Sequence, residues 1–256
     1  MSKLILTDLD HTLLRTDGTI SDHTLNVLKR CRDQGMLFAI ATARYWIGAE
    51  RYINLLKPDF EITTDGTIIH SKDRCIYRSE FTCEDTNEIV RLLLAAKPEA
   101  EITVADGKTV YWNSKHISES ERLHKAVYCK YDKPIMSRAN KIVAELPDDK
   151  IAIEIADKMG CKIQCYRGEN WYAFLPSGSG KIEAIRAMSD VTGIGLDEIV
   201  AFGDDKNDID MLKICGTGVA VSNAIKEVLD IADEVTLSND EDGVADWIAK
   251  NILGEK

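Results

Sequence analysis

Apolar runs that end in polar residues recur near the start of the chain. Leu4–Leu6 is a short apolar run that leads into an acidic segment, as expected of a buried parallel strand with polar residues at its carboxyl end. Ser21 is a good helix N-cap before a series of apolar positions, and Gly35 closes this helix. A second strand over 36–41 and a helix that reaches Leu56 follow. This alternation predicts a parallel sheet covered on both faces.

The last third of the chain repeats the same style of alternation. Its predicted helices cover 181–192, 208–215, 224–232 and 243–252. Its predicted strands cover 198–203, 218–221 and 234–237. The two ends of the chain are therefore expected to form one Rossmann-like α/β domain from residues 1–80 and 178–256.

The middle of the chain, residues 81–177, has a different pattern of short strands and turns. Predicted strands cover 75–81, 101–106 and 109–112, predicted helices lie near 85–96 and 137–144, and further segments follow over 151–156, 161–166 and 171–175. Asp106-Gly107-Lys108 is a hairpin signal between two of these strands. We interpret this region as an α+β domain inserted into the parallel-sheet domain.

Composition narrows the class of protein. The 256 residues are 45% hydrophobic and 29% charged, which is typical of a globular protein, and the net charge of −11 argues against broad nucleic-acid binding. The amino terminus becomes acidic after a few apolar residues, which fits neither a signal peptide nor a membrane span. Seven cysteines, an odd number without a CxxC pair or a repeated framework, indicate reduced thiols in a cytoplasmic protein. Cys161 and Cys165 could form half of a metal site, but no second Cys/His pair with suitable spacing accompanies them.

Two acidic segments follow predicted strands. Asp8 and Asp10 stand two residues apart after the first strand, so their side chains start on the same face, and a hard divalent cation such as Mg²⁺ would offset their charge. Asp204 and Asp208 follow the strand that ends near Gly203. Ligands bind at this edge of open parallel sheets, so both segments could meet around one metal. The alternative is that each is an acidic turn that caps a helix.

Two further polar residues could contact a phosphate. Thr42 ends the second strand, where its hydroxyl could bind a phosphoryl oxygen or cap a helix. Lys181 lies in the first turn of a predicted helix, where a cation is unfavourable unless an anion is near, although a surface lysine is an equal alternative. Leu175 and Ile182 break the nucleotide-binding GxxxxGK[ST] pattern, and no GxGxxG fingerprint supports a dinucleotide cofactor.

Taken in order, four segments resemble the four motifs of the haloacid-dehalogenase-like phosphatases. They are Asp8-Leu9-Asp10-His11-Thr12, Thr42, Lys181, and Gly203-Asp204 with Asn207-Asp208. The long insertion between the second and third motifs is similar to the cap of the Cof-type branch of that family, which includes many sugar-phosphate and cofactor-phosphate hydrolases. The resemblance covers nearly the whole chain.

The resemblance implies a role for each acidic residue. Asp8 would attack phosphorus and become an aspartyl-phosphate, and Asp10 would protonate the leaving oxygen and later activate water. Mg²⁺ would be bound by Asp8, by the backbone carbonyl of Asp10 and by Asp204, while Asp208 would support the metal site from behind.

The resemblance also implies which residues contact the substrate, a small phosphorylated metabolite. The phosphoryl group would be held by Leu9, Thr42, Ala43, Lys181 and Asn207. Aromatic and basic residues of the insertion are candidates for selecting the substrate, but aromatic residues in a small domain more often form its core, so none is assigned. These candidates are Trp112, Tyr128, Tyr166, Arg167, Trp171 and Tyr172.

Three positions depart from the family pattern. Ala43 and His11 stand where many relatives have glycine, and Asp65 adds a negative charge in the turn Thr64-Asp65-Gly66-Thr67, where relatives often have Asn-Gly-Ala.

Two other activities stay open: a phosphotransferase or phosphomutase that uses the same intermediate, and a relative that binds phosphate or metal without turnover. The oligomeric state is also open.

Overall fold

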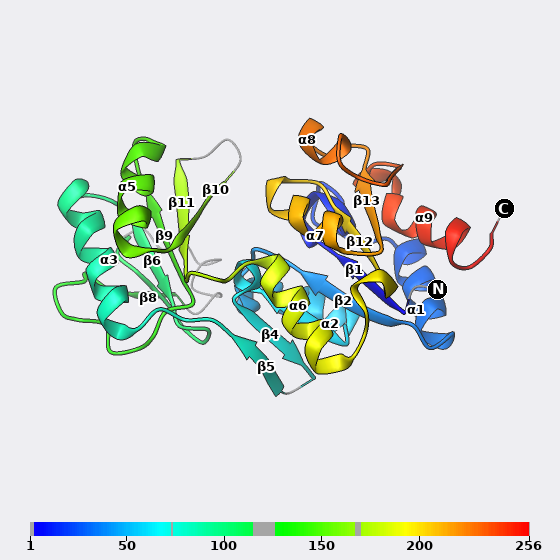
Figure 1. The fold of residues 1–256 in the computed structure, drawn as a ribbon, viewed down its shortest axis with the longest axis horizontal. Coiled ribbons are helices and arrows are strands. Elements are labelled where there is room, and N and C mark those ends of the chain that lie inside the picture. The colour runs from blue at the N-terminus through cyan, green and yellow to red at the C-terminus, as the bar shows by residue number, and fades with distance from the viewer. Residues whose placement is uncertain (1–2, 73, 115–125, 167–169, 256) are drawn as a thin grey trace. The chain divides into compact units, whose positions relative to one another are not determined.

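The computed structural model describes residues 3–72, 74–114, 126–166 and 170–255 (Figure 1). Contacts divide the chain into two compact units. The first, which we call the core unit, comprises Met1–Ala43, Glu50–Tyr77 and Lys181–Lys256. The second, the inserted unit, comprises Arg44–Ala49 and Arg78–Gly180.

The core unit contains an eight-stranded sheet in the order β14-β13-β12-β1-β2-β3-β4-β5. Its parallel strands are β1 (Leu4–Thr7), β2 (Leu37–Ala41), β3 (Phe60–Thr63), β12 (Ile199–Gly203), β13 (Thr217–Val221) and β14 (Glu234–Thr236). The hairpin strand β4 (Ile68–Ser71) runs antiparallel to β3 and precedes β5 (Arg74–Arg78). All residues of β1 and β12 are buried, as expected of central parallel strands covered on both faces.

In the part of the chain that the structure describes, six α-helices flank this sheet. They are α1 (Asp22–Asp33), α2 (Trp46–Leu56), α6 (Lys181–Thr192), α7 (Ile209–Ile214), α8 (Lys226–Leu229) and α9 (Gly243–Asn251). α1 packs against α9, and α6 packs against α7. Ser21 caps α1 by accepting a hydrogen bond from the Thr24 N–H at 3.0 Å. The predicted α/β class with a Rossmann-like parallel sheet is thus confirmed.

The inserted unit contains a six-stranded sheet in the order β10-β11-β9-β6-β7-β8. Its strands are β6 (Ile102–Ala105), β7 (Val110–Trp112), β8 (Ala126–Tyr128), β9 (Lys141–Glu145), β10 (Lys162–Cys165) and β11 (Trp171–Leu175). The helices α3 (Cys83–Ala96) and α5 (Asp149–Met159) pack together, and their buried side chains share one apolar core with the sheet. The expected hairpin around Asp106-Gly107-Lys108 joins β6 to β7.

Two predicted elements differ from the structure. The helix expected over 137–144 is wrong, because Lys141–Glu145 is the strand β9, which pairs with both β6 and β11. The helix expected over 224–232 is limited to α8, Lys226–Leu229. In the parts of the chain that the structure describes, no helix is both long enough and apolar enough to cross a bilayer.

Candidate active site

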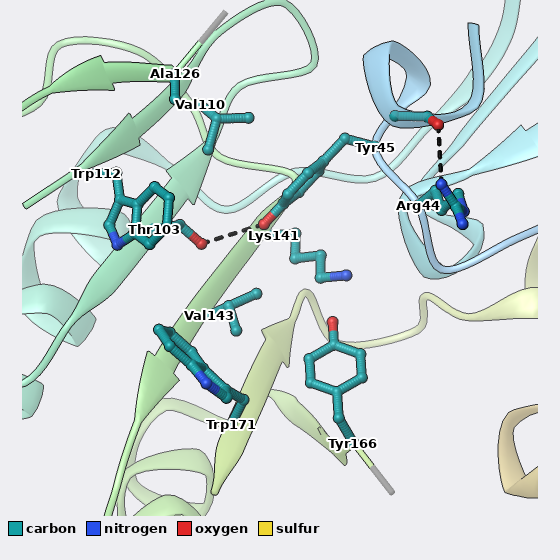
Figure 2. A pocket seen from close by; sticks show the side chains of 11 residues that line it. Arg44, Tyr45, Thr103, Val110, Trp112, Ala126, Lys141, Val143, Tyr166 and Trp171 are labelled. Carbon is teal, nitrogen blue, oxygen red and sulfur yellow. Dashed lines mark hydrogen bonds between the residues drawn. The ribbon is translucent and has the colours of Figure 1, made fainter. Parts of the chain in front are cut away.

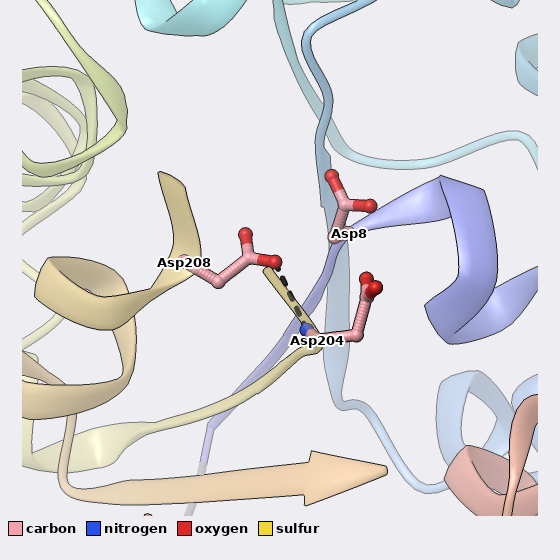
Figure 3. A group of neighbouring side chains, drawn as sticks. All are labelled: Asp8, Asp204 and Asp208. Carbon is pink, nitrogen blue, oxygen red and sulfur yellow. Dashed lines mark hydrogen bonds between the residues drawn. The ribbon is translucent and has the colours of Figure 1, made fainter. Parts of the chain in front are cut away.

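The carboxyl ends of β1 and β12 lie next to each other and carry the two acidic segments. Thr7 pairs with Phe202, and the Asp8 N–H donates to the Phe202 carbonyl at 3.0 Å. Asp204 follows β12 directly. Parallel pairing therefore brings together two aspartates that are 196 positions apart in the sequence (Figure 3).

A tight turn follows Asp8. Residues Leu9–Leu13 form a π-helical turn closed by the Leu14 N–H, which donates to the Leu9 carbonyl at 2.8 Å. His11 adopts φ 56°, a left-handed conformation that favours glycine. From this turn, the Thr12 hydroxyl donates to Asp204 Oδ1 at 2.7 Å. The turn thus positions Thr12, whose hydroxyl orients the Asp204 side chain.

Lys181 is the first residue of α6 and is buried in the site. Its Nζ donates to Asp8 Oδ1 and to Asp208 Oδ1, each at 2.6 Å. Burial alone would lower the pKa of Lys181, but the charges of Asp208 and Asp8 outweigh it and raise the pKa above its ordinary value. The lysine therefore stays protonated and bridges the segments that follow β1 and β12.

Asp208 has partners on both carboxylate oxygens. Its Oδ2 accepts hydrogen bonds from the backbone N–H of Asp204 at 3.0 Å and of Asp205 at 3.2 Å, while Oδ1 binds Lys181. Gly203 makes this arrangement possible, because a Cβ atom there would lie 2.7 Å from Asp208 Cγ. Asp208 thus fixes the loop that presents Asp204.

Asp8, Asp204 and Asp208 form a buried group whose ligand oxygens all lie within 4.8 Å of one another (Figure 3). Burial, opposed by Lys181 and reinforced by Asp208 and Asp204, raises the pKa of Asp8 well above its ordinary value. Burial and the charge of Asp208 raise the pKa of Asp204 to about 6. The pKa values of Asp8 and Asp204 are thus raised mainly by burial, whereas that of Lys181 is raised by the two carboxylates that it contacts.

This donor set fits a hard divalent cation. Carboxylate oxygens are the ligands that Mg²⁺ prefers, and a bound cation would offset the excess negative charge. Asp8 and Asp204 are the two carboxylates best suited to bind it, since both oxygens of Asp208 already accept hydrogen bonds. The Asp10 carboxylate is not part of the group formed by Asp8, Asp204 and Asp208. The resemblance implies that Asp10 contributes its backbone carbonyl to the metal, not its side chain.

Thr42 lies at the end of β2 and is buried. Its N–H donates to the Ile62 carbonyl at 2.9 Å, and its carbonyl accepts from the Asp65 N–H at 3.2 Å. Thr64, Asp65 and Gly66 have φ of 56°, 55° and 83°, so three successive residues are left-handed where the family pattern has an Asn-Gly-Ala turn. This turn holds the second-motif loop in place.

Sequence comparison and structure comparison agree on one family. Residues 5–248 match the model of the haloacid dehalogenase-like hydrolases. The chain belongs to this family.

The relatives of this chain include phosphatases. An HMP-PP phosphatase of Enterobacter sp. is 30% identical over 90% of this chain and 87% of the relative. A 5-amino-6-(5-phospho-D-ribitylamino)uracil phosphatase of Bacillus subtilis is 26% identical over 96% of each chain. The crystal structure of a haloacid dehalogenase-like hydrolase from Bacteroides thetaiotaomicron has a TM-score of 0.82 and 26% identity, covering 98% of this chain and 99% of the other. This haloacid dehalogenase-like hydrolase is therefore an enzyme of the phosphatase type.

The remaining motif residues of this haloacid dehalogenase-like hydrolase differ in burial. Leu9 is fully buried, whereas Asp10, Ala43 and Asn207 are half-buried, the last of them in the short turn Lys206–Asp208. The resemblance to the family motifs assigned no role to Thr12. Its hydroxyl, two residues after Asp10, gave no local signal of its partner, because Asp204 is distant in the sequence.

The candidate selectors in the insertion have different surroundings. Trp112, Tyr166 and Trp171 line a pocket of the inserted unit. Tyr172 is buried in the apolar core, and Tyr128 is exposed. Arg167 lies outside the described residues.

Proposed function

We propose that this phosphatase hydrolyses a small phosphorylated metabolite with Mg²⁺ and that the Asp8 carboxylate is the nucleophile. The observation that carries the proposal is the position of Lys181, whose ammonium binds Asp8 and Asp208 at 2.6 Å beside Asp204. An anionic nucleophile needs positive charge around it before it can approach an anionic phosphoryl group.

In the first step, an Asp8 oxygen attacks phosphorus and the ester P–O bond breaks. Asp10 gives its proton to the leaving oxygen, so the alcohol departs neutral and Asp8 carries the phosphoryl group. Lys181 keeps one Asp8 oxygen fixed, which leaves the other oxygen to attack.

In the second step, Asp10 takes a proton from water as the water oxygen bonds to phosphorus. The bond between phosphorus and Asp8 breaks, inorganic phosphate leaves, and both aspartates return to their starting states. Leu9, Thr42, Ala43 and Asn207 are proposed to contact phosphoryl oxygens alongside Lys181. Their backbone N–H groups and polar side chains are suitable donors.

Asp8, Asp204 and the Asp10 carbonyl are proposed to hold Mg²⁺, with Asp208 behind them. When bound, Mg²⁺ supplies positive charge that offsets the charge of the nucleophile and of the phosphoryl group. The buried, mutually repelling carboxylates of Asp8 and Asp204 support this assignment.

The inserted unit is proposed to select the substrate as a cap. The relatives named above act on HMP-PP and on a phosphorylated uracil derivative, which supports a small metabolite as the substrate here. The free thiols of all seven cysteines agree with a reducing compartment such as the cytoplasm.

The test is phosphate release from a panel of phosphate monoesters, with Mg²⁺ and with a chelator. We expect release with Mg²⁺ only, and none from an Asp8→Asn variant that keeps the circular dichroism spectrum of the wild type. Transfer of the phosphoryl group to an added sugar instead of water would identify a phosphotransferase. Undiminished release by Asp8→Asn would refute the nucleophile.

A further inference from the structure

Two asparagines hold the turn that follows β1 from outside. The Asn223 side chain donates to the His11 carbonyl at 2.8 Å, and the Asn239 side chain donates to the Leu14 carbonyl at 2.9 Å. His11 is the left-handed residue of the turn, and Leu14 is the residue whose N–H closes it. The two bonds therefore fix both the middle and the end of this turn.

A hydrogen bond between the two asparagines fixes how their amides are oriented. The Asn239 N–H donates to Asn223 Oδ1 at 2.9 Å. Because this oxygen is occupied, the amide nitrogen of Asn223 faces the His11 carbonyl, which can only accept. Asn239 is 4% exposed, so water does not readily replace its bond to the Leu14 carbonyl. We call Asn223 and Asn239 the asparagine pair.

The asparagine pair stands on backbone that is itself held in place. Asn223 lies two residues after β13, which pairs with β12 in the sheet. Asn239 begins a short 3₁₀ turn, which the Glu241 N–H closes on the Ser238 carbonyl at 3.1 Å. The pair can therefore act as a fixed support for the turn after β1.

Further bonds join the same two segments to the site. Arg15, which follows the turn, donates to both carboxylate oxygens of Asp242, at 3.1 and 2.8 Å. In the loop after β13, the Ile225 N–H donates to the Asp204 carbonyl at 2.9 Å. The asparagine pair thus belongs to a network that contacts both acidic segments, the one after β1 and the one after β12.

We propose that Asn223 and Asn239 are positioning residues, which hold the turn in the conformation that places Asp10. This inference rests on the proposed function, in which Asp10 is the acid and the base. Asp10 directly precedes His11, whose φ of 56° is unfavourable for a residue with a Cβ atom. Without the pair, the backbone at His11 can relax toward a more favourable φ, and the Asp10 carboxylate moves with it. A displacement of about 1 Å can lower a rate by about 100-fold.

The first measurement follows the turn itself, by hydrogen exchange and NMR. Asn223→Asp and Asn239→Asp keep the size of each side chain but replace the donor with an oxygen that repels the carbonyl. In each variant, the Leu14 amide should exchange faster by about fivefold or more. Asn251→Asp is the matched control, because Asn251 is an exposed asparagine that donates to the Trp247 carbonyl at 3.0 Å within α9.

The second measurement separates the placement of Asp10 from general damage, in the full-length enzyme with Mg²⁺. Nitrophenolate leaves p-nitrophenyl phosphate without an acid, whereas the alcohol of a metabolite ester such as glucose 6-phosphate or pyridoxal 5′-phosphate needs a proton. In Asn223→Asp, kcat/KM should fall about tenfold for the metabolite ester that the wild type hydrolyses fastest, and less than about twofold for p-nitrophenyl phosphate. Asn223 is exposed, so this variant serves even if Asn239→Asp fails to fold.

Two failures are distinguishable. Unchanged exchange of the Leu14 amide in the variants, or equal losses of kcat/KM for both kinds of ester, would overturn the positioning role alone. If the wild type with Mg²⁺ hydrolyses no member of the ester panel, the proposed function itself fails. The exchange measurement then still shows whether the asparagine pair holds the turn.

Discussion

Lys181 is the residue on which the charge balance of the site depends. Its side chain is 3% exposed and binds two buried carboxylates. Removing one partner of a buried ion pair leaves uncompensated charge, which costs about 3–5 kcal/mol. We therefore expect Lys181→Met to lower the free energy of unfolding in urea at pH 8 by this amount.

The matched control for Lys181→Met is Lys250→Met. Lys250 pairs with Asp246 at 2.8 Å, but its side chain is 57% exposed. Exposed pairs contribute below about 1 kcal/mol, so this variant should unfold almost as the wild type does. Equal losses in the two variants would contradict the buried-pair account.

The raised pKa of Asp204 predicts that the stability of the metal-free protein depends on pH. Its pKa is raised to about 6 in the folded protein, mainly by burial, above the ordinary value of 3.8. A carboxyl with a raised folded pKa favours folding while it is protonated, and this contribution is lost as pH rises through 6. Between pH 4.5 and 7.5, the wild type should lose stability relative to Asp204→Asn by on the order of 2 kcal/mol.

The measurement for Asp204 is urea unfolding of both proteins in a chelator across this pH range. Adding Mg²⁺ at pH 7.5 should stabilise the wild type and have much less effect on Asp204→Asn, because the variant lacks one proposed ligand. If the free energies of unfolding of the two proteins changed in parallel with pH, burial of the Asp204 carboxylate would not destabilise the folded protein.

Residue types and their order were enough to predict that Asp8, Asp204 and Lys181 lie together. Strand ends bring Asp8 and Asp204 together, and Lys181 at a helix start needs an anion nearby, as its contacts confirm. The bond from Thr12 to Asp204 could not be predicted, because it depends on the left-handed turn at His11. Histidine rarely adopts this φ, so the residue type at position 11 does not predict the turn.

At the scale of elements, β9 shows where local pattern fails. Residues 137–144 were expected to be helical, yet Lys141–Glu145 is held between β6 and β11. The strand is stabilised by partners about 30 to 40 positions away in the sequence, and β-branched Ile142 and Val143 suit it. Lys141 also weakened the strand pattern in the sequence, because it occupies a buried position where an apolar residue is usual.

The junction between β12 and the loop of Asp204 depends on a glycine. A Cβ atom at Gly203 would lie 2.7 Å from Asp208 Cγ and 2.9 Å from its Oδ2. Gly203→Ala should therefore displace Asp208, break its hydrogen bonds to the loop, and lower both stability and kcat, by about tenfold or more in kcat. Gly178→Ala is a useful contrast, because the space around Gly178 is open and only its φ of 71° opposes a side chain.

The expected outcome is a loss of Mg²⁺-dependent phosphate release in Gly203→Ala that Gly178→Ala does not share. Stability is followed in urea for both. Full activity in Gly203→Ala would mean that the loop of Asp204 adapts without loss, against the rigid arrangement seen around Asp208.

At the scale of the whole molecule, chemistry and selection are proposed to belong to different units. The acidic group and Lys181 belong to the core unit, and the pocket lined by Trp112, Tyr166 and Trp171 belongs to the inserted unit (Figure 2). Replacing residues 78–180 with the matching segment of the Enterobacter HMP-PP phosphatase should change the order of preferred substrates. Hydrolysis should still require Mg²⁺ and Asp8. Unchanged relative rates across a substrate panel would argue against selection by the inserted unit.

The central claim is that Asp8 becomes phosphorylated during turnover. It is tested most directly by mapping the phosphoryl group in an Asp10→Asn variant given p-nitrophenyl phosphate and Mg²⁺. This leaving group departs without an acid, whereas the second step lacks its base. We expect one equivalent of nitrophenolate per enzyme, little turnover afterwards, and a phosphoryl group on the peptide that contains Asp8 after acid quench. A phosphoryl group on another residue, or steady hydrolysis with no phosphorylated peptide, would contradict the account.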